Sequence, residues 1–166
     1  MLKRSGEMNL RGNVLTEQHA KEISTWHYEG KYALYDLPSW EEMQQQDYAL
    51  CAPKKRQRFM AYVNDQDELI GFVNLLDEGD FVFFGIGIHP NYCNQGIGKK
   101  VTALALKESR KRYPNKPLLL EVRTWNQRAV SCYVSQGFEI IETKIQTTYL
   151  GEGESYVMKY NQNGGE

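Results

Sequence analysis

Residues 86–100 read Ile86-Gly87-Ile88-His89-Pro90-Asn91-Tyr92-Cys93-Asn94-Gln95-Gly96-Ile97-Gly98-Lys99-Lys100. The pattern predicts a strand that stops at a proline, a polar loop, and a basic helix opened by two glycines. A helix start leaves backbone N–H groups without intrahelical partners, and glycines let a ligand approach the backbone closely. The stretch therefore predicts an anion-binding turn between a strand and a helix.

Two common phosphate motifs do not fit this turn. A P-loop would need glycine at position 93 and Ser or Thr at position 100, which are Cys93 and Lys100. A dinucleotide fingerprint would need a third glycine at position 101, which is Val101. Nucleotide binding of these two kinds is therefore disfavoured, and a plain glycine-assisted turn stays open as the structural alternative.

Residues 120–138, LEVRTWNQRAVSCYVSQGF, form the second informative stretch. Glu121 follows three leucines in a predicted buried strand, where a carboxylate is costly unless it is hydrogen-bonded or used in chemistry. The next segment predicts a helix with Asn126, Ala129, Val130 and Tyr133 on one face. Gly137 stands where a helix C-terminus favours glycine.

The rest of the chain predicts a mixed α/β fold of the α+β type. Thr16 is expected to cap a first helix and Ser39 a second one, in a Ser-x-x-Glu capping box. The expected order is β-α-α-β-β-β-α-β-α-β-β, a twisted mixed sheet of about seven strands with helices on both faces. The predicted strands cover 8–12, 58–63, 69–76, 81–88, 118–122, 138–149 and 155–160, and the helices 16–27, a short one from 39, 96–112 and 126–136. The strand at 58–63 is expected to alternate in burial, and the last two strands to form a hairpin turning at 151–153. Residues 1–160 are expected to form a single domain, followed by a flexible tail at 161–166.

Composition limits the partners that the chain can attract. Lys plus Arg number 20 against 21 for Asp plus Glu, a net charge of −1, so we expect neither nucleic acid nor a membrane as partner. Three unpaired cysteines and a start without an apolar stretch favour the cytoplasm. Histidines 19, 27 and 89 lack metal-type spacing, so no metal is expected. The basic run 54–58 is expected to be a solvated loop.

The two stretches together resemble the acetyl-CoA-binding core of the GNAT superfamily. Its pyrophosphate loop has the form Arg/Gln-x-x-Gly-x-Gly/Ala, and a later segment reads Asn-x-x-Ala-x-x-x-Tyr-x-x-x-Gly-Phe. The likeness covers about residues 69–160. Leu-Glu-Val-Arg, with its glutamate twelve residues before the helical tyrosine, is similar to the ribosomal-protein alanine N-acetyltransferases.

The resemblance implies acetyl-CoA as co-substrate and assigns roles by position. Ile86 and Ile88, with Gly87 between them, would offer backbone groups to the pantetheine arm. The pyrophosphate would be wrapped by main-chain amides of Asn94, Gln95, Gly96, Ile97, Gly98 and Lys99. Asn126 would hydrogen-bond the pantetheine or the strand edge, and Tyr133 would approach the cofactor sulfur.

Two positions depart from the family pattern. Cys93 stands where Arg or Gln is usual, which weakens the match little because backbone amides do most of the phosphate binding. Phe83 or Phe84 stands where many relatives place a glutamate, which puts the usual base in doubt. Glu121 is the expected base, a role that matches its counterpart in the alanine acetyltransferases. Tyr133 is the expected acid for the thiolate, since a phenol with a pKa of about 10 stays protonated at neutral pH. The structural alternatives are a carboxylate that anchors Arg123 or a helix N-terminus, and a core tyrosine.

The acceptor is expected to be a primary amine, on a protein N-terminus or on a small molecule. As the corresponding segment does in this superfamily, Tyr28, Tyr32 and Tyr35 would line the acceptor side. A non-catalytic acyl-CoA-binding module is the alternative reading. The closing hairpin, a common dimer surface in the superfamily, would make a homodimer possible.

Overall fold

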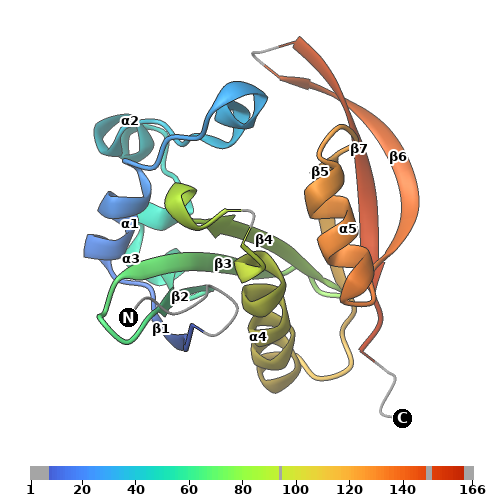
Figure 1. Ribbon diagram of the computed structural model, residues 1–166, viewed down its shortest axis with the longest axis horizontal. Coiled ribbons are helices and arrows are strands. Elements are labelled where there is room, and N and C mark those ends of the chain that lie inside the picture. Colours follow the sequence, from blue (N-terminus) through green and yellow to red (C-terminus); the bar gives the residue numbers. More distant parts are fainter. Residues whose placement is uncertain (1–7, 94, 149–150, 163–166) are drawn as a thin grey trace. The chain divides into compact units, whose positions relative to one another are not determined.

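The computed structural model describes residues 8–93, 95–148 and 151–162. Figure 1 shows its elements in chain order: β1 (Arg11–Val14), α1 (Glu17–Ile23), η2 (Gly30–Tyr35), α2 (Trp40–Gln45), η3 (Ala49–Cys51), α3 (Pro53–Arg56), β2 (Phe59–Val63), β3 (Leu69–Asp77), β4 (Val82–Ile88), η4 (Pro90–Tyr92), α4 (Ile97–Arg112), β5 (Leu118–Arg123), α5 (Gln127–Ser135), β6 (Glu139–Thr148) and β7 (Gly151–Tyr160). The seven strands form one sheet in the order β1-β2-β3-β4-β5-β7-β6. β4 and β5 run parallel, whereas β5–β7 and β6–β7 are antiparallel. The predicted mixed fold is confirmed.

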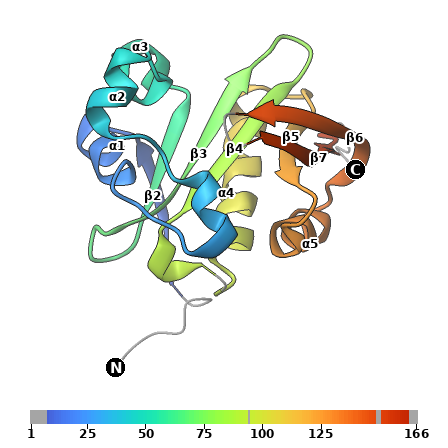
Figure 2. The same ribbon diagram turned by 90° about the horizontal axis from the view of Figure 1, so that it is seen from above.

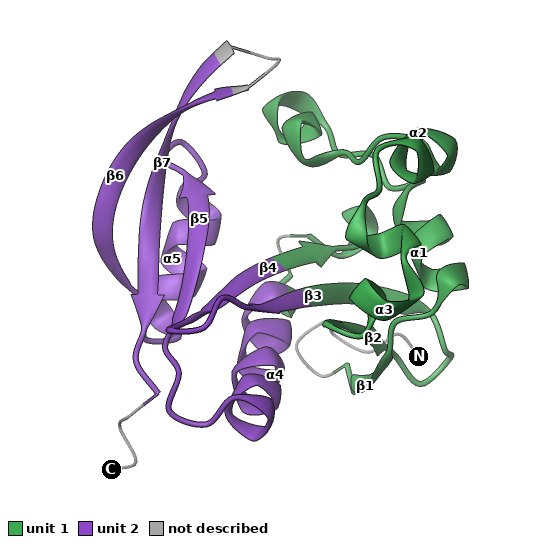
Figure 3. Cartoon of the chain, turned by 180° about the vertical axis from the view of Figure 1, so that it is seen from behind, with its two compact units in different colours: residues 1–73, 86–97 green, residues 74–85, 98–166 purple. Residues whose placement is uncertain are grey.

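The chain divides into two compact units, coloured separately in Figure 3. Unit 1 comprises residues 1–73 and 86–97, and unit 2 comprises residues 74–85 and 98–166. Within the residues described, no helix has both the length and the apolar character needed to cross a bilayer.

Unit 1 is built around an apolar cluster beneath its helices. Thr16 and Ser39 cap α1 and α2 as predicted, each accepting a hydrogen bond from a backbone N–H three residues on. The helices α1, α2 and α3 lie together in this unit (Figure 2). Apolar side chains from α1, α2, η3 and the residues beside them meet β2 and the start of β3 in a core that contains Leu15, Ile23, Trp26, Met43, Leu50, Phe59, Val63 and Leu69.

Two local predictions in unit 1 are wrong. All five residues of β2 are buried rather than alternating, which is expected of a strand covered on both faces. The basic run at 54–58 is not a loop throughout, because Pro53 opens the short helix α3, although Lys54, Lys55 and Gln57 are exposed as expected. Arg56 in this helix is only 7% exposed. Its guanidinium Nη1 is itself buried, which a charge count does not reveal.

Unit 2 contains α5, most of α4 and the long, curved hairpin of β6 and β7 (Figure 1). The hairpin turn is not at 151–153 as predicted, because Gly151 and Gly153 belong to β7 and pair with Thr148 and Gln146. Phe138, just before β6, packs against Tyr160 of β7 with ring centroids 5.4 Å apart. Gly137 has a φ of +105°, which fits its predicted place after the end of α5.

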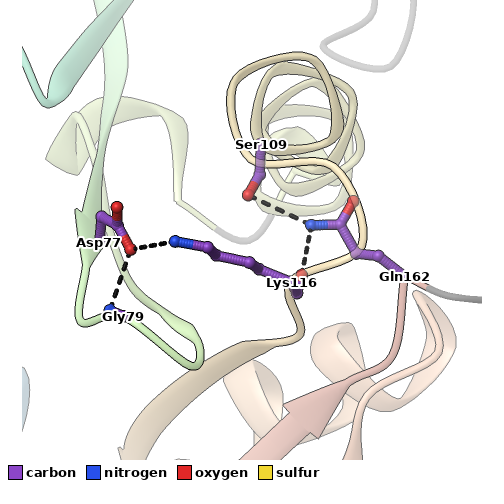
Figure 4. A network of polar contacts seen from close by, with 5 residues as sticks. All are labelled: Asp77, Gly79, Ser109, Lys116 and Gln162. Atoms are coloured by element: carbon purple, nitrogen blue, oxygen red, sulfur yellow. Dashed lines mark hydrogen bonds and ion pairs between the residues drawn. The ribbon is translucent and has the colours of Figure 1, made fainter.

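A polar network in unit 2 connects the β3–β4 turn to Gln162 through Lys116 (Figure 4). Asp77 Oδ1 accepts hydrogen bonds from Lys116 Nζ at 2.7 Å and from the backbone N–H of Gly79 at 3.0 Å. Gln162 Nε2 donates to the carbonyl oxygen of Lys116 at 2.8 Å and to Ser109 Oγ at 3.3 Å. Gln162, placed by the sequence in a flexible tail, is therefore held by two hydrogen bonds; residues 163–166 of that tail lie outside the described residues.

Candidate functional site

The glycine-rich turn links the end of β4 to α4. Gly96 has a φ of +78°, in the left-handed region that favours glycine, and a Cβ there would meet nothing within 4 Å. Ile97 begins α4 and is fully buried, whereas Gln95 and Lys99 are exposed. The first N–H groups of a helix lack intrahelical acceptors, so Gly96 to Lys99 present donors at a positive dipole end. Asn94, also predicted to bind here, lies outside the described residues.

The end of β4 in unit 1 is tightly covered. Gly87 lies under the ring of Phe72, because a Cβ at position 87 would stand 2.3 Å from that ring. The carbonyl oxygen of Ile88 accepts a hydrogen bond of 2.7 Å from the hydroxyl of Tyr28. The next backbone N–H, that of His89, donates to the carbonyl oxygen of Ile70 at 2.8 Å. Glycine at 87 is therefore a packing requirement, and Ile88 is anchored by a side chain 60 residues away in sequence.

Asn126 and Tyr133 lie at the start and on the buried face of α5. Asn126 is the N-cap, and its Oδ1 accepts a hydrogen bond from the N–H of Ala129 at 3.3 Å. Tyr133 is 8% exposed, and its ring meets Phe84 edge-on at 6.4 Å and Phe138 at 5.7 Å. Phe84, one of the two phenylalanines that the sequence offered for the usual carboxylate position, is itself a core residue at 2% exposure. Helix capping therefore helps to hold the Asn126 side chain in place, and core packing helps to hold the Tyr133 ring.

Glu121 sits on β5 but is not enclosed by apolar side chains. Burial alternates along β5, and Glu121 is on the half-buried face. Its Oε2 accepts a hydrogen bond from Lys144 Nζ at 2.6 Å and its Oε1 one from Gln146 Nε2 at 2.7 Å. The side chain of Gln146 in turn accepts a hydrogen bond from Ser155 Oγ at 3.3 Å. The carboxylate is therefore held in place by β6, rather than by Arg123 or a helix N-terminus.

The tyrosines predicted to line the acceptor side differ in their surroundings. Burial raises the pKa of Tyr28 above its ordinary value of 10.0, and Cys93 and Asp36 act in the same direction. Tyr28 is therefore a neutral donor at physiological pH. Tyr32 is half-buried within η2, and Tyr35 at its end is 40% exposed. A cavity of about 620 Å³ in unit 1 is lined by other residues, among them Lys21, His27, Trp40 and Glu41.

The three cysteines and the possible metal ligands are the remaining candidates for chemistry. Cys51, Cys93 and Cys132 form no disulfide with one another. Burial raises the pKa of Cys132, against smaller opposing effects of Thr102 and Lys99, so its thiol stays protonated at neutral pH. Among the described residues, no three His, Cys, Asp or Glu side chains gather as a metal site would require.

Sequence reasoning missed the partners that fix the candidate residues. Lys144 and Gln146 hold Glu121 from 23 and 25 residues away, and Asp36 holds the backbone N–H of Tyr28 at 2.8 Å. No motif marks these residues. Alternation along β6 could have placed Lys144 and Gln146 on one face of that strand, but not the register that brings them to β5.

Known proteins share sequence and fold with most of this chain. The model of the acetyltransferase (GNAT) family matches residues 20–138, a range that contains the β4–α4 turn, Glu121, Asn126 and Tyr133. The peptidyl-lysine N-acetyltransferase YiaC of Escherichia coli K12 is 33% identical over 97 residues, or 55% of this chain. That alignment spans 61% of the relative's length.

Solved structures share the fold at low sequence identity. The ribosomal-protein alanine N-acetyltransferase of Escherichia coli has a TM-score of 0.69 at 18% identity, with 95% of this chain and 97% of that chain covered. The spermidine N-acetyltransferase of Vibrio cholerae, in complex with CoA and spermine, also has a TM-score of 0.69 at 18% identity, covering 92% and 95%. The family match extends over most of the described chain and includes both sequence stretches that suggested it. The chain belongs to the acetyltransferase (GNAT) family.

Proposed function

We propose that the protein is an acetyl-CoA-dependent N-acetyltransferase that transfers the acetyl group directly to a primary amine. The observation that carries the proposal is the family match over residues 20–138, which contains a strand end and a glycine-opened helix start of the kind that binds anions. Gly96 to Lys99, with Asn94 and Gln95, would bind the pyrophosphate. The backbone of Ile86 to Ile88 would align the pantetheine arm, and Asn126 would hydrogen-bond the pantetheine or the strand edge.

The transfer needs a general base, a donor to the oxyanion and a general acid, and the chain has a candidate for each role. An amine in water is mostly protonated and must lose its proton before it attacks the thioester carbonyl. Glu121 would accept that proton, directly or through water, while its carboxylate is held by Lys144 and Gln146. A backbone N–H near Ile88 would stabilise the oxyanion, and Tyr133 would protonate the leaving thiolate.

The acceptor class is proposed from the related enzymes, which are named for a peptidyl lysine, a ribosomal-protein alanine and spermidine. All three are amines, on a peptide or on a small molecule. The alternative, an acyl-CoA-binding module without catalysis, is supported by the expectation that Phe83 or Phe84 stands where many relatives place a glutamate.

Release of free thiol from acetyl-CoA tests the proposal. The panel comprises spermidine, a peptide with an N-terminal alanine, and an N-terminally blocked peptide with one internal lysine. We expect thiol release that depends on one of these amines, with mass spectrometry locating the acetyl group. Binding of CoA without transfer to any member of an extended amine panel would favour the sensing module.

A further inference from the structure

The hydroxyl of Tyr28 makes a hydrogen bond within the protein. It donates to the carbonyl oxygen of Ile88 at 2.7 Å, and the next N–H along, that of His89, donates to Ile70 at 2.8 Å. Both ends of the peptide group that ends β4 are thus held by unit 1. A phenol has a single proton to donate. The Tyr28 hydroxyl therefore has no proton left to donate to a bound acceptor, because that proton is used within the protein.

Asp36 fixes the segment that carries Tyr28. Its Oδ1 accepts the backbone N–H of Tyr28 at 2.8 Å, and its Oδ2 lies 3.1 Å from His27 Nδ1. The carboxylate is 26% exposed, whereas the His27 side chain is 74% exposed. Since Asp36 follows η2, it closes the loop between Tyr28 and the end of that helix. The loop and the last peptide of β4 are then tied together through one phenol.

We propose that Tyr28 and Asp36 form a clamp that positions the end of β4 for acetyl-CoA, so that Tyr28 is a positioning residue rather than an acceptor contact. The inference rests on the proposed function, in which the backbone of Ile86 to Ile88 aligns the pantetheine arm. Phe72 over Gly87 restrains the same strand end from a second direction. Without the clamp, a smaller fraction of the cofactor-free molecules has the end of β4 in the conformation that binds the cofactor. The apparent affinity for the cofactor falls in proportion to that fraction.

Kinetic constants of Tyr28→Phe, with one acceptor from the panel above, separate the two roles. Phenylalanine keeps the ring and removes only the hydroxyl, so the Ile88 carbonyl loses its 2.7 Å donor and keeps only the weaker Cys93 Sγ contact at 3.8 Å. We expect kcat/KM for acetyl-CoA to fall about tenfold, and KM for the amine to stay unchanged. Asp36→Asn keeps an oxygen for the Tyr28 N–H and should stay near wild type, whereas Asp36→Ala should resemble Tyr28→Phe. Tyr48→Phe is the matched control, since Tyr48 packs against the core of the same unit.

Amide hydrogen exchange on the ligand-free proteins tests the clamp independently of catalysis. Exchange in the segment 88–91 should be faster in Tyr28→Phe and Asp36→Ala than in wild type or Tyr48→Phe. A raised KM for the amine with unchanged acetyl-CoA constants would make Tyr28 an acceptor contact and overturn the clamp. So would unchanged exchange. A wild-type protein that neither binds CoA nor acetylates would instead refute the proposed function, while the exchange measurement would still decide the clamp.

Discussion

At the scale of single residues, Tyr133 is both a core side chain and the proposed acid. Its ring meets Phe84 and Phe138, and phenylalanine at 133 would keep those contacts. Tyr133→Phe should therefore bind CoA with near wild-type affinity while turnover falls about 10²-fold, as for a lost general acid. Calorimetric titration with CoA and steady-state kinetics give the two numbers. Unchanged turnover, or equal loss of affinity and turnover, would make Tyr133 a packing residue only.

Glu121 allows a sharper test of the base, because its partners are now known. If Glu121 accepts the proton of the amine, Glu121→Gln should lower the rate most at neutral pH and below. At high pH the amine arrives neutral, and the variant should approach wild type. The rate should therefore be followed across pH in both proteins.

Thermal stability separates this base role from a structural one. The Lys144 side chain is 36% exposed, so an unpaired ammonium there can be hydrated and the loss of stability should be small. Lys144→Met is the control, since it removes the same ion pair and leaves the carboxylate. A stable Glu121→Gln with a pH–rate profile like that of wild type would remove Glu121 from the mechanism.

At the scale of elements, the start of α4 offers two glycines that differ in backbone conformation. A methyl group at position 96 would meet no atom but would require a φ of +78°. At position 98 it would lie 3.7 Å from Cys132 Sγ, an ordinary contact in a helix. Gly96→Ala should therefore lose about 1 kcal/mol of stability through backbone strain, whereas Gly98→Ala should keep or gain stability.

The same pair of variants tests how the cofactor approaches the turn. Weaker CoA binding in Gly98→Ala, despite unchanged stability, would mean that the pyrophosphate approaches the backbone closely at that position. Weaker binding in Gly96→Ala would report the shape of the turn. Melting curves with and without CoA separate the two effects. Equal stability of both variants would contradict the conformational argument.

The capping box of α1 predicts a pH dependence of stability. His19 Nδ1 accepts a hydrogen bond from the N–H of Thr16 at 3.1 Å, which a protonated nitrogen cannot do. Burial lowers the pKa of His19 below its ordinary value of 6.5, and Glu22 partly opposes this shift. The unfolded chain therefore binds the proton more readily than the folded one. The contribution of His19 is complete above pH 6.5 and is lost as the pH falls towards its folded pKa.

His19→Gln isolates that contribution. Glutamine at the third helical position can also complete a capping box but does not titrate. The melting temperature of wild type should fall more steeply from pH 7 to pH 5 than that of His19→Gln. Every other side chain is the same in both proteins, so the difference between the two curves reports His19. Parallel curves would show that the bond to Thr16 is not linked to protonation.

These elements also show what the sequence could predict. The caps at Thr16 and Ser39 and the left-handed glycine after α5 depend on neighbours within four residues, so local chemistry sufficed for them. The hairpin turn failed, because Gly151 and Gly153 look like turn residues but pair with Thr148 and Gln146 in the strand. The pairing of Glu121 with Lys144 depends on the register of three strands, which spacing along one chain does not determine.

At the scale of the whole molecule, the proposed cofactor should stabilise the fold. A ligand that binds only the folded state at 100 times its dissociation constant adds about 2.7 kcal/mol. For a chain of this size, 1 kcal/mol raises the melting temperature by about 2–4 °C, so CoA should raise it by roughly 5–11 °C.

Parallel melting measurements with ATP and NAD show which part of CoA the protein binds. ATP and NAD carry adenosine and phosphates but no pantetheine, and the turn fits neither the P-loop nor the dinucleotide pattern, so both should shift the melting temperature little. Gly96→Asp should abolish the CoA shift, because it places a negative charge and a strained backbone against the pyrophosphate. Equal shifts with ATP and CoA would mean that the turn binds phosphate without reading the pantetheine arm. No shift with millimolar CoA would mean that this chain has kept the family's fold without its cofactor.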